Sequence, residues 1–170
     1  MKALAPALAF AFAAVLMLPG CGLQPLYAGG DRGPVATTLG RIEVAAIAGR
    51  GGWLMRNALN DRLRAGGASD ARYRLEIELD DRITGFGVRT DNAVTRERRT
   101  LRARYRLVDA SGGMVVLDAT AGSDAGIDVV SSDYATVAAE QTALENLTND
   151  VADQIVARLA LYARRSGTGG

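Results

Sequence analysis

Residues 73–79, Tyr-Arg-Leu-Glu-Ile-Glu-Leu, alternate strictly between apolar and charged side chains. Residues 101–107, Leu-Arg-Ala-Arg-Tyr-Arg-Leu, alternate in the same way, with arginine at every charged position. Because successive side chains of a β-strand point to opposite faces of its sheet, each stretch predicts a strand with one buried and one exposed face. Together the two stretches predict a long hairpin, and this hairpin decides the fold.

The charges of the two stretches also predict how they pair. If the turn is centred on Asp91, Leu75 lies opposite Leu107 and Glu76 lies opposite Arg106. A shift by one residue would place glutamates against apolar residues, so the sequence favours this register.

The other elements follow from hydrophobic periodicity. We expect a strand at residues 41–47, a helix at 52–65, a fourth strand at 114–121 with a loop at 122–128, and a helix at 132–165. Ser131 or Ser132 should cap this last helix. Its predicted apolar stripe consists of Tyr134, Val137, Leu144, Leu147, Val151, Ile155, Leu159 and Tyr162. The distal part of the hairpin, residues 81–100, contains two glycines on one arm and should twist or bulge. The order β-α-β-β-β-α predicts an α+β two-layer sandwich, in which two helices cover one face of a four-stranded mixed or antiparallel sheet.

The first 20 residues indicate an export signal that is removed. A basic start is followed by a sixteen-residue apolar run, Ala3 to Leu18, which is shorter than the roughly 20 residues that a spanning helix needs. The ending Leu18-Pro-Gly-Cys21 resembles the lipobox of bacterial lipoproteins, which implies cleavage before Cys21 and lipidation of this residue. The alternative is an ordinary secretory signal. Cys21 is the only cysteine, so it cannot form an internal disulfide, and lipidation explains it directly.

The chain after the signal divides into three parts. Residues 21–38 are rich in glycine and proline and predict a lipidated tether, residues 39–165 a single domain, and residues 166–170 a disordered tail. Among lipoproteins, aspartate after the cysteine commonly retains the protein in the inner membrane. Here Gly22 follows Cys21, so the resemblance implies the outer membrane, with the domain facing the periplasm.

The composition argues against several classes of function. Without Lys2 the 20 basic residues become 19, which balance the 19 acidic residues, so no nucleic acid partner is expected. The mature chain has no histidine and no lysine, so the usual general bases and zinc ligands are missing. We therefore expect neither an enzyme nor a metal or cofactor, apart from the covalent lipid on Cys21. The enzyme alternative is a hydrolase that uses carboxylates alone, with Asp80 and Asp81.

Three further motifs resemble the LptE family of lipopolysaccharide-assembly lipoproteins. They are Cys21-Gly-Leu-Gln-Pro-Leu-Tyr27, Leu54-x-Arg56-Asn57-x-Leu59-x-Asp61-x-Leu63 and Ser132-x-Tyr134-Ala135. Leu23 departs from the pattern, since an aromatic residue is usual there. The resemblance implies a protein that plugs the outer-membrane barrel LptD and assists delivery of lipopolysaccharide to the cell surface. The alternative is a structural lipoprotein of another envelope complex.

Lipopolysaccharide carries phosphates, which guanidinium groups bind through paired hydrogen bonds. The candidate ligands are Arg96, Arg98 and Arg99 near the end of the hairpin, with Arg89 across the turn. The alternative is a solvated strand face, since Glu97 lies among these arginines.

Overall fold

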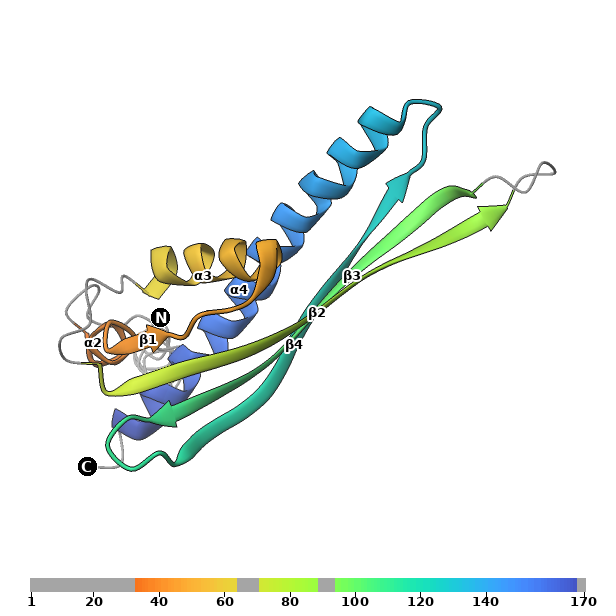
Figure 1. The fold of residues 1–170 in the computed structure, drawn as a ribbon. Coiled ribbons are helices and arrows are strands. Elements are labelled where there is room, and N and C mark those ends of the chain that lie inside the picture. The colour runs from red at the N-terminus through yellow and green to blue at the C-terminus, as the bar shows by residue number, and fades with distance from the viewer. Residues whose placement is uncertain (1–32, 64–70, 89–93, 168–170) are drawn as a thin grey trace, which may run out of the picture.

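The computed structural model describes residues 33–63, 71–88 and 94–167. Its elements are α2 (Pro34–Leu39), β1 (Ile42–Val44), α3 (Gly49–Leu63), β2 (Tyr73–Val88), β3 (Val94–Asp109), β4 (Val115–Asp128) and α4 (Asp133–Gly167). They form the predicted α+β sandwich, with helices on one side of a four-stranded mixed sheet (Figure 1). The predicted signal, Cys21, most of the tether, Arg89 and the last three residues lie outside the described ranges.

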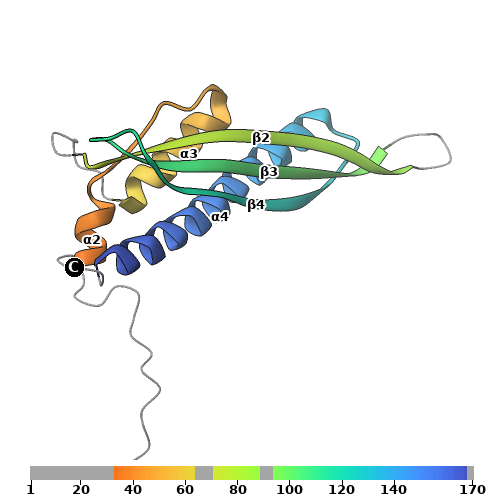
Figure 2. The same cartoon turned by 90° about the horizontal axis from the view of Figure 1, so that it is seen from below.

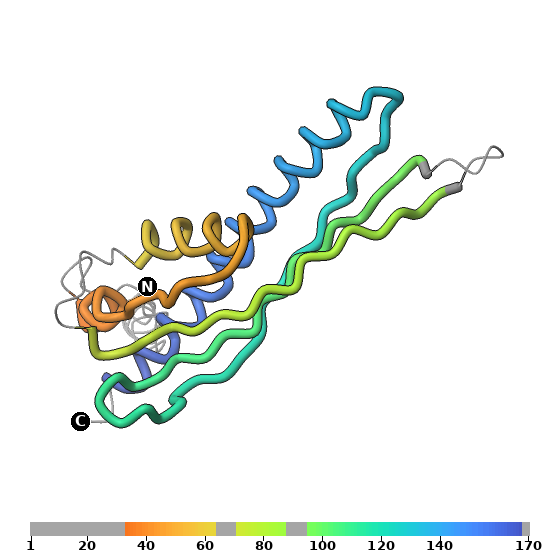
Figure 3. Tube along the Cα trace, in the orientation of Figure 1, coloured from red at the N-terminus to blue at the C-terminus, as the bar shows by residue number. Residues whose placement is uncertain are grey.

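The sheet has the order β1-β2-β3-β4, with β1 parallel to β2 and the other pairs antiparallel. The predicted hairpin register is confirmed, because Leu75 lies opposite Leu107 and Glu76 opposite Arg106. The same register continues to the last pair, Val88 opposite Val94. The expected distal irregularity is therefore wrong except at Gly87, which has a left-handed φ of 77° and no partner in the register. Figure 3 shows β2 and β3 running side by side to the distal end.

Strand β4 is longer than predicted, and the expected loop at residues 122–128 is wrong. These residues pair with β3 as far as Asp128 opposite Arg96. Glycine and aspartate have low strand propensity, but pairing with a long neighbouring strand overrides it. The Arg102 side chain lies against Gly122, and a Cβ there would lie 2.5 Å from its Cδ, so a larger residue would displace this side chain.

Helix α4 buries the predicted apolar stripe against the sheet and α3. The buried members of this stripe are Leu144, Leu147, Val151, Ile155 and Leu159. The first turns differ from the prediction, since Tyr134 and Val137 are exposed. Ser132 caps the helix as expected, because its hydroxyl accepts a hydrogen bond from the Ala135 amide at 3.4 Å.

Residues 34–38, predicted as tether, instead belong to α2. Val35 and Leu39 are buried in the core, and α2 contacts α4 near its C-terminal end (Figure 2). Pro34 is favourable in the first turn because it has no amide hydrogen to satisfy there. A six-residue helix is too short for its periodicity to be recognised among glycines and prolines. At the other end, residues 166–167 continue α4, so the predicted tail begins too early.

Candidate functional site

One face of the sheet carries no helix, and we call it the open face (Figure 1). The other face, against which α3 and α4 pack, is the covered face. The open face holds the even-numbered side chains of β2 and β3, because sheet side chains alternate. The central strand β3 presents a row of arginines there: Arg96, Arg98, Arg102, Arg104 and Arg106.

Acidic side chains of the flanking strands pair with this arginine row. The nitrogen to oxygen distances are 3.0 Å for Arg96–Asp128, 3.9 Å for Arg98–Asp124, 3.0 Å for Arg104–Asp118 and 3.3 Å for Arg106–Glu76. These side chains are all substantially exposed, so each pair contributes only about 0 to 1 kcal/mol. The open face is therefore a network of positive and negative side chains. Because each ion pair is weak, its members can exchange partners at little cost.

A hydrogen-bonded ion pair in this network changes the pKa values of both of its side chains. The Arg104 guanidinium lowers the pKa of the Asp118 carboxyl below its ordinary value, and Asp118 raises the pKa of Arg104. Asp118 is therefore ionised at neutral pH.

Arg102 differs from its neighbours because no carboxylate of the described residues lies within ion-pair distance of it. Its Nη1 donates long hydrogen bonds of 3.4 Å to the carbonyls of Leu101 and Ser123, and its side chain lies across Gly122. A depression of about 420 Å³ lies here, lined by Glu78, Leu79, Asp80, Arg102, Ala103, Arg104 and Thr120. It offers two guanidinium donors beside two carboxylates.

The four predicted phosphate ligands do not form one patch. Arg96 and Arg98 lie on the open face, and the guanidinium carbon of Arg98 lies 5.5 Å from the centre of the Phe86 ring. Arg99 lies on the covered face, because its position in β3 has the opposite parity. Glu97 also faces that side, and one of its carboxylate oxygens is buried without a hydrogen bond among the described residues. Arg89 lies outside the described ranges.

Arg99 joins the hairpin to α4. Its Nε and Nη2 donate hydrogen bonds of 2.8 and 2.6 Å to the two carboxylate oxygens of Asp81. Its Nη1 donates a bond of 2.7 Å to the carbonyl of Glu140 in α4. The side chain is only 12% exposed, and the bond to Asp81 raises its pKa. The guanidinium group of Arg99 therefore links the sheet to α4.

The carboxylate pair proposed for hydrolysis is not assembled. Asp80 lies on the open face and pairs with Arg82 at 2.8 Å, whereas Asp81 lies on the covered face with Arg99. Two carboxylates on opposite faces of one strand cannot act on the same bond. In the described part of the chain, no group of three or more potential metal-ligating side chains is placed to hold an ion.

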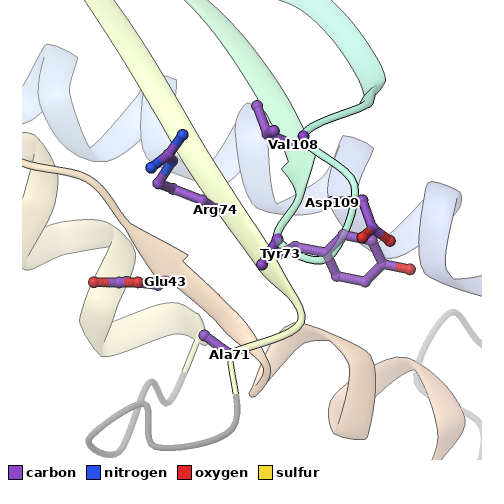
Figure 4. Close-up of a pocket in the computed structure, with 8 residues that line it drawn as sticks. Glu43, Ala71, Tyr73, Arg74, Val108 and Asp109 are labelled. Carbon is purple, nitrogen blue, oxygen red and sulfur yellow. The ribbon is translucent and has the colours of Figure 1, made fainter.

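A second depression of about 170 Å³ lies at the proximal end of the sheet, and Figure 4 shows its lining. Glu43, Arg74 and Asp109 supply its charges. Hydrogen bonds from the Ser111 hydroxyl and amide lower the pKa of Asp109, the last residue of β3, and stabilise the turn that follows. Tyr73 packs edge to face on Tyr162 at 6.0 Å, and burial raises the pKa of its hydroxyl. These residues build the turn and the core, so this depression has no chemistry of its own.

The sequence alone did not identify Arg102 as the arginine of this row that has no carboxylate partner among the described residues. The alternation of arginines along β3 was a visible signal, but residues 122–128 were predicted as a loop, so the neighbours of Arg102 were unknown. No helix in the described ranges is both long and apolar enough to cross a membrane.

Comparison with known proteins identifies the family. Residues 39–159 match the model of the LptE family, described as lipopolysaccharide-assembly. A lipoprotein from Caulobacter crescentus CB15 has a similar structure, with a TM-score of 0.66 and 30% identity, covering 78% of this chain and 98% of that one. No curated protein sequence matches the chain.

Two more distant structures share the fold. Rare lipoprotein B from Shewanella oneidensis has a TM-score of 0.58 and 10% identity, covering 74% of this chain and 96% of that one. A minor lipoprotein from Acinetobacter baumannii has a TM-score of 0.56 and 16% identity, covering 71% and 89%. The family model spans most of the domain, and the arrangement of sheet and helices agrees with these relatives. The chain belongs to the LptE family of lipopolysaccharide-assembly proteins.

Proposed function

We propose that this protein is an outer-membrane lipoprotein that plugs the LptD barrel and assists delivery of lipopolysaccharide to the cell surface. The observation that carries the proposal is the match of residues 39–159 to the lipopolysaccharide-assembly family. The role is one of binding and assembly, without catalysis and without a cofactor.

The N-terminal sequence supports the membrane attachment. A short apolar signal ends in Leu18-Pro-Gly-Cys21, and lipidation at Cys21 would place the anchor 12 residues before the first described residue, Gly33. Several acyl chains on one residue hold a protein on a bilayer far better than one chain does. Because Gly22 follows the cysteine, we assign the outer membrane. Mass spectrometry of the mature N-terminus tests this point: an unmodified Cys21, or a fragment that begins before it, contradicts the lipoprotein assignment.

The shape and the open face support a position inside a barrel. The 35 residues of α4 form a rod of about 52 Å, and the sheet runs beside it. The interior of outer-membrane barrels is polar, and a sheet face of exposed ion pairs is compatible with such a wall. An apolar face of this size would instead favour burial against lipid or another core.

Direct binding of lipopolysaccharide is assigned to the open face. Of the predicted phosphate ligands that the structure describes, Arg96 and Arg98 are accessible, at 65% and 60% side-chain exposure. Their present partners are exposed carboxylates, which a phosphate can replace at little cost. Arg102 and Arg104 line the depression of about 420 Å³ on the same face and extend this row of arginines. We leave Arg99 out of this role because its donors bind Asp81 and the Glu140 carbonyl.

Purification from membranes in mild detergent tests the function. We expect the full-length lipoprotein to bring a large barrel protein with it, and the Cys21→Ala variant to remain folded in the periplasm but to leave the membrane fraction. The second candidate, a structural lipoprotein of another envelope complex, predicts purification with a different partner and no barrel.

A further inference from the structure

The two edges of the sheet differ in how their outward backbone groups are covered. At the β4 edge, the side-chain amide of Gln154 in α4 accepts a hydrogen bond from the Gly122 amide at 3.3 Å and donates one to the Gly122 carbonyl at 3.2 Å. Ser123 also donates a hydrogen bond to Asp150 of α4 at 3.3 Å. An exposed strand edge is a template for pairing, and here α4 covers part of it.

The opposite edge is covered only at its proximal end. Strand β1 pairs with residues 73–75 of β2 and then ends, with a last bond of 3.0 Å from the Ala45 amide to the Leu75 carbonyl. The backbone N–H and C=O groups of Tyr73 and Leu75 therefore point toward β1. Because these groups alternate in direction along a strand, those of the later odd-numbered residues of β2 point to the same side. We call the backbone of Ile77, Leu79, Asp81, Ile83 and Gly85 the distal edge of β2.

The distal edge is regular and unprotected. In the described part of the chain, no backbone hydrogen bond reaches its outward groups. On its other side β2 pairs with β3 without a register shift from residue 73 to residue 86. Natural edges are usually interrupted by proline, by a bulge or by a covering element. This stretch has no proline and no bulge, and none of the described elements pairs with it. Residues 81–87 are all exposed.

The charges on this edge indicate what would fit beside it. On the open face, Glu78 lies opposite Arg104, but Arg104 makes its ion pair with Asp118. Glu78 therefore makes no ion pair with the described residues, whereas Glu76 and Asp80 each have an arginine partner. On the covered face, Leu79 is half-buried and Ile83 is 42% exposed. An added strand would therefore alternate a basic residue beside Glu78 with apolar residues beside Leu79 and Ile83.

A second copy of this chain meets like charges when the two-fold axis lies between Leu79 and Arg82. In an antiparallel pair of β2 strands, a two-fold axis at Asp80, Asp81 or Arg82 places that charged residue opposite itself. An axis at Leu79 places two acidic residues, Glu78 and Asp80, opposite each other. Like charges directly opposite each other destabilise a strand pair.

We propose that the distal edge of β2 binds an extended basic segment of the barrel protein, which adds to the sheet as a fifth strand. This inference rests on the proposed function, and it specifies the surface through which the plug is held. Main-chain hydrogen bonds supply affinity in this mode of recognition, and alternating side-chain contacts supply specificity.

The test is the Ile83→Pro variant. The Ile83 amide points away from β3, so proline removes an outward donor and leaves the hairpin bonds intact. Ile83→Val keeps the amide, and Gly126→Pro makes the same change at an outward position of β4. We expect Ile83→Pro to lower the barrel recovered per lipoprotein at least about tenfold, while both controls bind like wild type. Thermal unfolding confirms that each variant is folded.

Hydrogen exchange of the wild-type complex gives a second measurement that needs no variant. We expect slower exchange in peptides covering residues 77–85 when the barrel is bound, and unchanged exchange in peptides covering residues 118–126. Unaltered exchange at residues 77–85, or full barrel recovery by a folded Ile83→Pro protein, overturns the inference and leaves the proposed function intact. Failure of the wild type to bring down any barrel overturns both. A dimer of the purified protein that Ile83→Pro dissolves shows a second copy as the occupant instead.

Discussion

The proximal and distal halves of the hairpin share one register but are stabilised in different ways. In the proximal half, Leu75, Leu101 and Leu107 are fully buried beneath α3 and α4. In the distal half, residues 81–87 are exposed on both faces, and the strands rely on their ladder and on ion pairs. A continuous strand pairing therefore does not require a continuous core. The distal half is a surface, whose side chains are available for contacts with other molecules.

The largest effect is expected where the proximal core is broken. Ile155 is fully buried, so Ile155→Asp places a carboxylate without a partner in an apolar layer, and Leu144→Asp does the same nearby. We expect each to lower the free energy of unfolding by more than about 4 kcal/mol, measured by thermal or urea unfolding. Ile83→Asp in the distal half is the matched control and should cost about 1 kcal/mol or less. Equal losses in both halves would show that the distal hairpin belongs to the core.

The second effect concerns Arg99, which pairs with Asp81 in the distal hairpin and donates a hydrogen bond to the Glu140 carbonyl of α4. Arg99→Met keeps the length of the side chain but removes its hydrogen bonds to Asp81 and to the Glu140 carbonyl. We expect a loss of about 1 to 3 kcal/mol and faster hydrogen exchange in residues 133–142 of α4. Arg98→Met on the open face should change stability by less than about 0.5 kcal/mol. The same exchange in both variants would contradict the assignment of Arg99 as the link.

The third effect should appear in binding and not in stability. Arg96→Glu combined with Arg98→Glu reverses two exposed charges, and we expect binding of purified lipopolysaccharide to fall at least about tenfold while the unfolding temperature stays the same. Wild-type binding should weaken with added salt, since exposed phosphate contacts are screened within about 8 Å at physiological ionic strength. The control is the proximal double variant Arg74→Glu and Arg106→Glu, which changes the net charge by the same amount. If it reduces binding as much, the whole face attracts lipid through its charge and the distal position is irrelevant.

The smallest effect is a pH dependence from Asp118. Arg104 lowers the pKa of this carboxyl in the folded protein, so the pair stabilises the fold above the unfolded pKa of aspartate, about 3.9. This contribution disappears as the pH falls through the lowered folded pKa. Acid unfolding of Asp118→Asn should therefore show a weaker pH dependence between neutral and acidic pH than the wild type shows. An unchanged profile would mean that the pair contributes nothing measurable.

Local patterns were sufficient to predict the features that depend on neighbouring residues in the chain. The alternation at residues 73–79 and 101–107 gave both strands, their inner faces and their register, and the structure confirms all three. The stripe from Leu144 to Leu159 gave the buried face of α4 in the same way. Such patterns are reliable because side-chain direction repeats with a fixed period in strands and helices.

Features that depend on a partner distant in sequence were predicted wrongly or not at all. Residues 122–128 have a composition typical of a loop, yet β3 extends them into a strand. Residues 34–38 were predicted as tether, yet they form α2 with Leu39, and α2 buries Val35 and Leu39 in the core. The sequence grouped Arg99 with Arg96 and Arg98, but Asp81 and the Glu140 carbonyl bind it on the other face of the sheet.

The sequence by itself determined the strand pairing, the charged character of one sheet face and, through its motifs, the family. Only the tertiary structure decided which arginines remain accessible, where the hydrophobic core ends along the hairpin, and which edge of the sheet is left unpaired. The physical reason is that periodicity and charge are properties of consecutive residues. Burial, ion-pair partners and free backbone groups depend instead on which distant segments pack against a residue after the chain has folded.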